Sequence, residues 1–169
     1  VEEGVNKFKV EIPLKNVRLW WTWDLGYPHL YRGAIEIFYE GITSDSTEVV
    51  FGLRRVKMIR RGSSWVFYLN GKRLFIRGTN YAPTDSFLSR VSIADIERDA
   101  ELMRKANINM VRIHAHVNPL ALKVFDRIGI LVWQDMPLQW VYSKGVLEDA
   151  VSNAKELCWL VDNHPSVAI

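Results

Sequence analysis

The sequence has a single cysteine, Cys158, so it cannot form an internal disulfide bond. Cys158 lies in an apolar segment with helical spacing, and we expect a buried, unreactive thiol. Such sparing use of cysteine favours a cytoplasmic protein. The chain also has no signal-peptide pattern at its start and no apolar run long enough to span a bilayer, so we expect no membrane partner.

An excess of charge of one sign is also missing, because 22 basic and 19 acidic residues give a net charge of only +3. The densest basic run, residues 54–61, alternates as the outward face of a strand does. No nucleic-acid-binding motif accompanies this run, so we expect no nucleic-acid partner. Hydrophobic residues make up 49% of the chain, and such a composition predicts a globular protein with a substantial core.

The first part of the chain, residues 1–61, has the pattern of β-strands. Apolar and polar residues alternate over residues 8–12, 34–39 and 48–53. Gly41, Asp45 and Ser46 supply turn chemistry between the last two stretches. Short strands at this spacing are typical of an antiparallel sandwich, and 61 residues are few for a complete one, so we expect further strands outside this sequence.

Residues 20–31 stand out because they contain three tryptophans and two tyrosines beside Gly26 and Pro28. An aromatic cluster of this kind can serve as a platform on which the faces of sugar rings stack. The alternative is a loop that its tryptophans pin to the neighbouring domain. The residues alone leave both interpretations open.

From residue 62 onward, short strands alternate with helices. Residues 65–77 predict a β-hairpin whose turn is Asn70-Gly71, a pair suited to a type I′ turn. Three later apolar runs, ending near Ile113, Trp133 and Ile169, are separated by helical segments of 10 to 16 residues. This order predicts a parallel sheet with right-handed crossover connections.

The predicted helices have recognisable ends. Ser92, with Asp95 three residues later, forms a capping-box pattern at the start of the first helix. Asn118 and Pro119 mark the start of the second, and Gly129 stands just past its end. A third helix is predicted over residues 147–162, where His164-Pro165 stops it.

Polar and aromatic residues follow the parallel strands, at the edge where a parallel α/β sheet presents its site. The candidates for this site are Asn80, Arg112, His114, His116, Trp133, Asp135 and Trp140. A buried charge requires a partner, so we expect Arg112 to orient a carboxylate. A glutamate outside this sequence is one candidate for that carboxylate. Two histidines fall short of the three or four ligands of a zinc site, so we expect no metal.

Two candidates have structural alternatives that the sequence leaves open. Asp135 either hydrogen-bonds a sugar hydroxyl or anchors its own loop. Trp133 either stacks on a sugar face or caps the barrel core. Asp85 is interpreted as a turn residue and not as the partner of Asp135 in a catalytic pair.

Several stretches resemble glycoside hydrolase family 2, which contains β-galactosidases, β-glucuronidases and β-mannosidases. These stretches are residues 51–54, 69–80, 107–112 and 125–133. The resemblance implies a partial immunoglobulin-like β-sandwich over residues 1–61. It also implies that residues 62–169 form the first half of a TIM (β/α)8 barrel and end in strand 4.

The resemblance further implies a retaining exo-β-glycosidase, β-mannosidase- or β-galactosidase-like, that hydrolyses terminal β-linked sugars without an organic cofactor. It also implies that the candidate residues at the strand ends bind the sugar. In the family, the acid/base glutamate ends barrel strand 4 and the nucleophile lies near strand 7. Residues 164–169 look like the start of strand 4, so we expect both glutamates to lie outside this sequence and the chain to be inactive alone. The alternatives are a non-catalytic carbohydrate-binding or structural module and one half of a split glycosidase.

An incomplete barrel leaves an open edge strand and an uncovered apolar face. We therefore expect a partner that covers them, either the remainder of the barrel or a complementary chain. Association with a second copy of the same chain is the other way to cover this edge.

Overall fold

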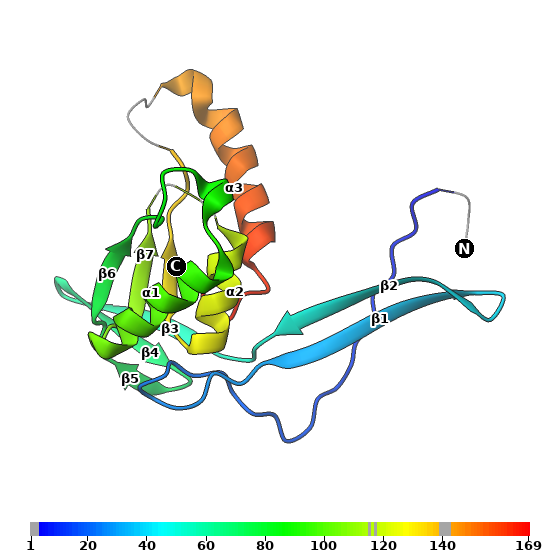
Figure 1. Cartoon of the computed structure of the whole chain (residues 1–169), viewed down its shortest axis with the longest axis horizontal. Coiled ribbons are helices and arrows are strands. Elements are labelled where there is room, and N and C mark those ends of the chain that lie inside the picture. The colour runs from blue at the N-terminus through cyan, green and yellow to red at the C-terminus, as the bar shows by residue number, and fades with distance from the viewer. Residues whose placement is uncertain (1–3, 115, 117, 139–142) are drawn as a thin grey trace.

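The structure is a computed structural model, and it describes residues 4–114, 116, 118–138 and 143–169. A two-stranded antiparallel ribbon, β1 (Tyr31–Tyr39) and β2 (Ile42–Phe51), projects from a rounded α/β body (Figure 1). Glu40 and Gly41 form its turn with positive φ values of 49° and 80°. Asp45 and Ser46, which we predicted near the turn, instead lie within β2.

The strand predicted at residues 8–12 is wrong. Residues 5–15 are exposed and belong to no strand. The apolar side chains of the ribbon are also exposed, with 57% of Ile35 and 60% of Phe38 accessible to solvent. The alternating pattern at residues 8–12 forms no strand, because no neighbouring strand pairs with it. The ribbon leaves its apolar side chains exposed, because two strands cannot bury an apolar face by themselves. Among the described residues, the ribbon of β1 and β2 is therefore the part that corresponds to the predicted sandwich.

A second antiparallel sheet connects the ribbon to the rest of the body. Its strands, in the order β3-β4-β5, are β3 (Val56–Arg61), β4 (Ser64–Leu69) and β5 (Lys72–Leu74). The predicted turn between β4 and β5 is confirmed, since Asn70 and Gly71 both have the positive φ that a type I′ turn requires. The boundary predicted between residues 61 and 62 falls at the end of β3, where the turn to β4 begins.

The third sheet is parallel, as the strand and helix order predicted. Its strands are β6 (Gly78–Tyr81), β7 (Met110–Ile113) and β8 (Leu131–Gln134). A parallel bridge between Val132 and Val167 adds the beginning of the next strand beside β8. The connections are η1 (Leu88–Arg90), α1 (Ile93–Lys105), α2 (Pro119–Ile128), η2 (Lys144–Val146) and α3 (Leu147–Val161). This order of elements agrees with the predicted first part of a TIM barrel.

The helix ends confirm the predicted capping patterns. The Ser92 side chain accepts a hydrogen bond from the Asp95 backbone N–H, and the Asp95 carboxylate accepts one from the Ser92 N–H. Asn118 caps α2 through its side-chain oxygen, and Gly129 ends it in the left-handed conformation at φ 84°. These caps satisfy backbone groups that have no partner within the helix.

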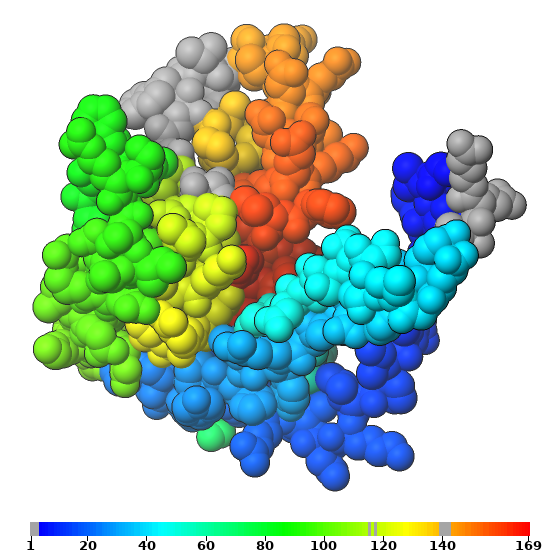
Figure 2. All heavy atoms as spheres, turned by 45° about the vertical axis from the view of Figure 1, so that its right-hand side comes forward, coloured from blue at the N-terminus to red at the C-terminus, as the bar shows by residue number. Residues whose placement is uncertain are grey.

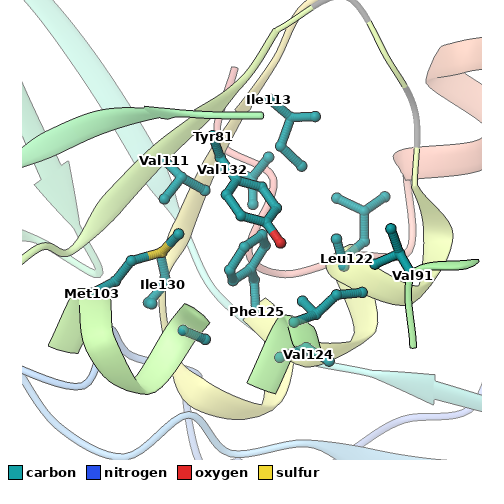
Figure 3. Packing of buried hydrophobic residues seen from close by; sticks show 13 residues of the cluster. Tyr81, Val91, Met103, Val111, Ile113, Leu122, Val124, Phe125, Ile130 and Val132 are labelled. Atoms are coloured by element: carbon teal, nitrogen blue, oxygen red, sulfur yellow. The ribbon is translucent and has the colours of Figure 1, made fainter. Parts of the chain in front are cut away.

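The main core lies between one face of the parallel sheet and helices α1 and α2. Figure 3 shows Val111 and Val132 from the sheet facing Met103 of α1 and Phe125 of α2. The Tyr81 ring meets the Phe125 ring edge to face at a centroid distance of 5.6 Å. On the opposite face of the sheet, Met110 and Leu131 are buried in a second cluster with Trp20, Leu69 and Leu74. Arg112 and Trp133, two residues further along the same strands, stay accessible and leave that end of the face available for a site.

Helix α3 contains no buried residue, and its outer surface is exposed. Figure 2 shows α3, in orange to red, on the outside of the body beside the ribbon. Trp159 is 90% exposed and Cys158 is exposed, so the predicted burial of this thiol is wrong. The predicted helix is confirmed as α3, but no described segment buries its apolar residues.

Candidate functional site

Three predicted site residues form a row across the interior face of the parallel sheet. The strand register pairs Asn80 with Arg112, and Arg112 with Trp133. All three line a hollow of about 370 Å³, whose other walls include Phe67 and Met110. The Arg112 guanidinium carbon lies 5.9 Å from the centre of the Trp133 ring. Neighbouring parallel strands thus bring together residues that are distant in sequence.

Asp135 joins this row through a bidentate ion pair. Arg112 Nε donates to Asp135 Oδ1 at 3.2 Å, and Arg112 Nη2 donates to Oδ2 at 2.5 Å. His114 Nδ1 lies 3.0 Å from the same Oδ2 atom. A planar guanidinium holds a carboxylate in one orientation when both oxygens are engaged. The carboxylate that Arg112 was predicted to orient is therefore Asp135 in this structure.

The surroundings of Asp135 favour its charged form. Partial burial acts to raise its pKa, but hydrogen bonds and positive charge from Arg112 and His114 outweigh burial and hold the pKa below its usual value. A depressed pKa in the folded state stabilises the fold at pH values above the unfolded-state pKa of about 3.9. That contribution is lost as the pH falls through the folded-state pKa.

Removing Arg112 is therefore expected to raise the pKa of Asp135. Carbon-detected NMR of the Asp135 carboxyl across a pH titration measures its midpoint in the original chain and in Arg112→Ala. The original chain should titrate below about 3.9, and the variant should titrate at a higher pH. Arg98→Ala, on the exposed face of α1, is the control and should leave the midpoint unchanged. An equal midpoint in Arg112→Ala and the original chain would contradict the ion pair.

The two predicted histidines have different surroundings. Strand β7 ends at Ile113, so His114 and His116 do not share one side of an extended strand. His114 reaches Asp135, whereas His116 Nδ1 lies 3.0 Å from the His114 carbonyl oxygen. Trp140 lies outside the described residues. Contact between sugar and any of the predicted site residues stays a prediction.

Gln134 is a positioning residue that the sequence analysis missed. It is 8% exposed, and its side-chain Nε2 donates to the carbonyl oxygens of His116 and Asp135 at 2.8 Å each. Gln134 thereby ties the loop after β7 to the loop after β8. The available signal was a polar residue that interrupts the apolar strand before Asp135.

Two tryptophans of residues 20–31, Trp20 and Trp23, hydrogen-bond to the backbone of the parallel α/β part. Trp20 is fully buried, and its Nε1 donates to the Asp126 carbonyl oxygen at 2.7 Å. Trp23 Nε1 donates to the Ile108 carbonyl oxygen at 2.9 Å, and Trp23 N donates to Gly129 O at 3.0 Å. These hydrogen bonds pin the loop to the segment of residues 108–129, and burial leaves the Trp20 ring unavailable as a sugar platform.

A polar network holds the same loop beneath the amino ends of the parallel strands. Asn109 is fully buried and donates to Asp24 Oδ2 at 3.0 Å and to the Phe75 carbonyl oxygen at 3.0 Å. Arg77 Nη2 donates to the same Asp24 oxygen at 2.5 Å. This network closes the end of the sheet opposite the candidate site.

Comparison with known proteins identifies the chain. Residues 61–169 match the family described as glycosyl hydrolases family 2, TIM barrel domain, and residues 1–54 match glycosyl hydrolases family 2. The chain belongs to glycosyl hydrolase family 2. This family 2 chain combines part of an N-terminal sandwich domain with the start of the barrel.

The similar proteins are glycosidases of greater length. β-Mannosidase A of Emericella nidulans is 27% identical over 191 aligned positions, covering 98% of this chain and 19% of that protein. The structure of β-D-mannosidase from Dictyoglomus thermophilum is 29% identical with a TM-score of 0.77, covering 91% of this chain and 20% of that one. Parabacteroides merdae β-glucuronidase is 26% identical with a TM-score of 0.77, covering 91% and 19%. The family 2 chain thus spans about one fifth of the length of these relatives.

Proposed function

We propose that this family 2 chain is part of a retaining exo-β-glycosidase that hydrolyses terminal β-linked sugars. The observation that supports this proposal is the row of Asn80, Arg112 and Trp133, with Asp135 fixed beside it, on the interior face of a family 2 barrel sheet. Relatives named as β-mannosidases and β-glucuronidases support the same reaction class. The proposed substrates are β-mannosides, β-galactosides and β-glucuronides.

These residues offer a sugar complementary contacts. Trp133 is 42% exposed, so part of its ring is available to stack on a sugar face. Asn80 is exposed and carries both a donor and an acceptor for hydroxyl groups. Asp135, oriented by Arg112, provides acceptor lone pairs at a fixed position. We propose that this wall binds and orients the sugar.

Asp135 is poorly suited to be a catalytic carboxyl group. A general acid needs a raised pKa to carry a proton near neutral pH, whereas the pKa of Asp135 is lowered. Both of its oxygens already accept hydrogen bonds from Arg112. Retaining glycosidases also need a second carboxyl group at about 5 Å. We therefore propose that the acid/base and the nucleophile are glutamates outside residues 1–169.

The isolated chain should accordingly show no turnover of nitrophenyl β-mannoside, β-galactoside or β-glucuronide, whereas the full-length protein should release nitrophenol from one of them. Spectrophotometric release of nitrophenol measures both reactions. Asp135→Asn is the matched control for the isolated chain. Release by the isolated chain that Asp135→Asn abolishes would contradict the proposed absence of the catalytic groups.

We also propose a partner for the uncovered surfaces. Val151, Trp159 and Leu160 of α3 are exposed, and the strand that starts at Val167 pairs on one side with β8. The remainder of the barrel, a complementary chain or a second copy would cover these surfaces.

No helix among the described residues has the length and apolarity that crossing a membrane requires. A cytoplasmic location stays part of the proposal.

A further inference from the structure

Two separated stretches of the sequence lie directly against each other. Gly52, which follows β2, packs on Pro165, where a side chain on Gly52 would place its Cβ 2.7 Å from the proline Cγ. Asn163 Nδ2 donates to the Val50 carbonyl oxygen at 2.9 Å across the same contact. The sandwich segment therefore touches the start of the fourth barrel strand.

Arg54 makes the polar part of this contact. Its Nε donates to the Pro165 carbonyl oxygen at 3.0 Å, and its Nη2 donates to the Val167 carbonyl oxygen. Burial lowers the pKa of the guanidinium, while attraction to Asp126 and Asp162 acts in the opposite direction. A partly buried guanidinium with two backbone acceptors is held in one orientation, because its donors form a rigid planar fork.

The two carbonyl groups that Arg54 binds are not the ones used by the neighbouring strand. The Ser166 carbonyl oxygen accepts from Val132 N at 2.8 Å, and Ala168 N donates to Val132 O at 2.9 Å. Strand β8 thus takes the Ser166 carbonyl and the Ala168 amide, and Gln134 N of β8 also donates to the Ile169 carbonyl oxygen at 2.9 Å. Arg54 takes the carbonyl groups of Pro165 and Val167. In a barrel, a strand pairs on both sides, so Arg54 occupies positions that a strand on the other side would otherwise use.

Asp126 fixes the same turn from α2. Its Oδ1 accepts from Ser166 N at 2.9 Å, and its Oδ2 lies 2.5 Å from His164 Nδ1. The Asp126 side chain is 8% exposed and the Ser166 residue is fully buried. Residues 164–167 are therefore held by α2, by β8 and by the sandwich segment together.

We propose that Arg54 is a positioning residue that sets the start and register of the fourth barrel strand from the sandwich side. By filling the carbonyl positions of Pro165 and Val167, it keeps a following barrel strand from pairing at these two residues. The consequence for catalysis rests on the proposed function, in which a glutamate that follows this strand is the acid/base. Arg54 then orients that glutamate without touching the sugar.

The first experiment tests the positioning in this chain without using activity. Hydrogen exchange measured by NMR at the Val132 and Ala168 amides reports the pairing between β8 and the fourth strand. Arg54→Ala should accelerate exchange at both amides by about tenfold or more, because hydrogen bonds to a charged group are lost. Arg54→Lys should fall between, since an ammonium group lacks the planar fork. Arg55→Ala, the exposed neighbour, should leave both rates unchanged.

The second experiment measures kinetics in the full-length protein. Arg54→Ala should lower kcat by roughly tenfold to a hundredfold while KM stays within about twofold, because the displaced group acts in the reaction and not in sugar binding. Arg54→Lys should recover part of kcat, and Arg55→Ala should match the original protein. Thermal unfolding of each variant identifies a loss caused by unfolding alone.

The outcomes separate the two proposals. Unchanged exchange at Val132 and Ala168 in Arg54→Ala would overturn the positioning role, whatever the enzyme does. Accelerated exchange with an unchanged kcat would overturn its catalytic consequence. A full-length protein that cleaves none of the β-glycosides would overturn the proposed function and leave the exchange experiment to decide the structural role of Arg54.

Discussion

Replacing Asp135 with alanine in the full-length protein is expected to lower kcat/KM for its β-glycoside by roughly tenfold to a hundredfold. A charge-assisted hydrogen bond to a sugar hydroxyl contributes about 1.5–3 kcal/mol, and each 1.4 kcal/mol corresponds to a factor of ten. The same change leaves Arg112 without the carboxylate that it binds through two hydrogen bonds. Steady-state kinetics with the nitrophenyl substrate measures the effect.

Two further variants show whether the loss comes from the oriented carboxylate. Asp135→Asn keeps an acceptor oxygen but removes the charge, so its kcat/KM should lie between those of the original protein and Asp135→Ala. Asp85→Asn is the matched control, because Asp85 accepts from the Phe87 backbone N–H in an exposed turn. A normal kcat/KM in Asp135→Ala would show that Asp135 only anchors its own loop, the alternative that the sequence left open.

Replacing Trp20 with alanine is expected to lower the free energy of unfolding by about 3–5 kcal/mol, the range for a buried aromatic side chain. Trp20 is fully buried against Leu69, Leu74 and Leu131. The variant also leaves the Asp126 carbonyl oxygen without the indole donor. Urea unfolding followed by circular dichroism gives the change, provided that both chains unfold with similar slopes.

Trp159→Ala is the matched control for this prediction. Trp159 is 90% exposed, so its removal should change the free energy of unfolding by less than about 0.5 kcal/mol. Trp20→Phe retains most of the packing but not the hydrogen bond, and it should lie between the two alanine variants. Equal unfolding midpoints for Trp20→Ala and Trp159→Ala would refute the role of Trp20 in joining the loop to the barrel segment.

Local sequence patterns predicted the local structure well where the interactions are themselves local. The cap of Ser92 and Asp95 joins residues three apart, and the Asn70-Gly71 turn depends on the conformations of two adjacent residues. The pattern failed where partners were needed from elsewhere. Alternation over residues 8–12 produced no strand, and the apolar spacing around Cys158 produced no burial.

The candidate site was predicted only in part. The order of strands and helices placed Asn80, Arg112 and Trp133 at one end of a parallel sheet, and the structure brings them into one row. Gln134 was missed, because its hydrogen bonds go to backbone groups of two different loops. No residue pattern along a single strand encodes which loop will approach it.

By itself, the sequence determined the types and order of elements from residue 62 onward, the helix caps, the Asn70-Gly71 turn, and the polar residues near the ends of the parallel strands. Only the tertiary structure decided the partners: Arg112 with Asp135, 23 residues apart, Trp20 with Asp126, 106 apart, and Arg54 with Pro165, 111 apart. The physical reason is one of range. Backbone propensities and caps act over a few residues, whereas a long side chain finds its acceptor only after strand register and packing have fixed both positions.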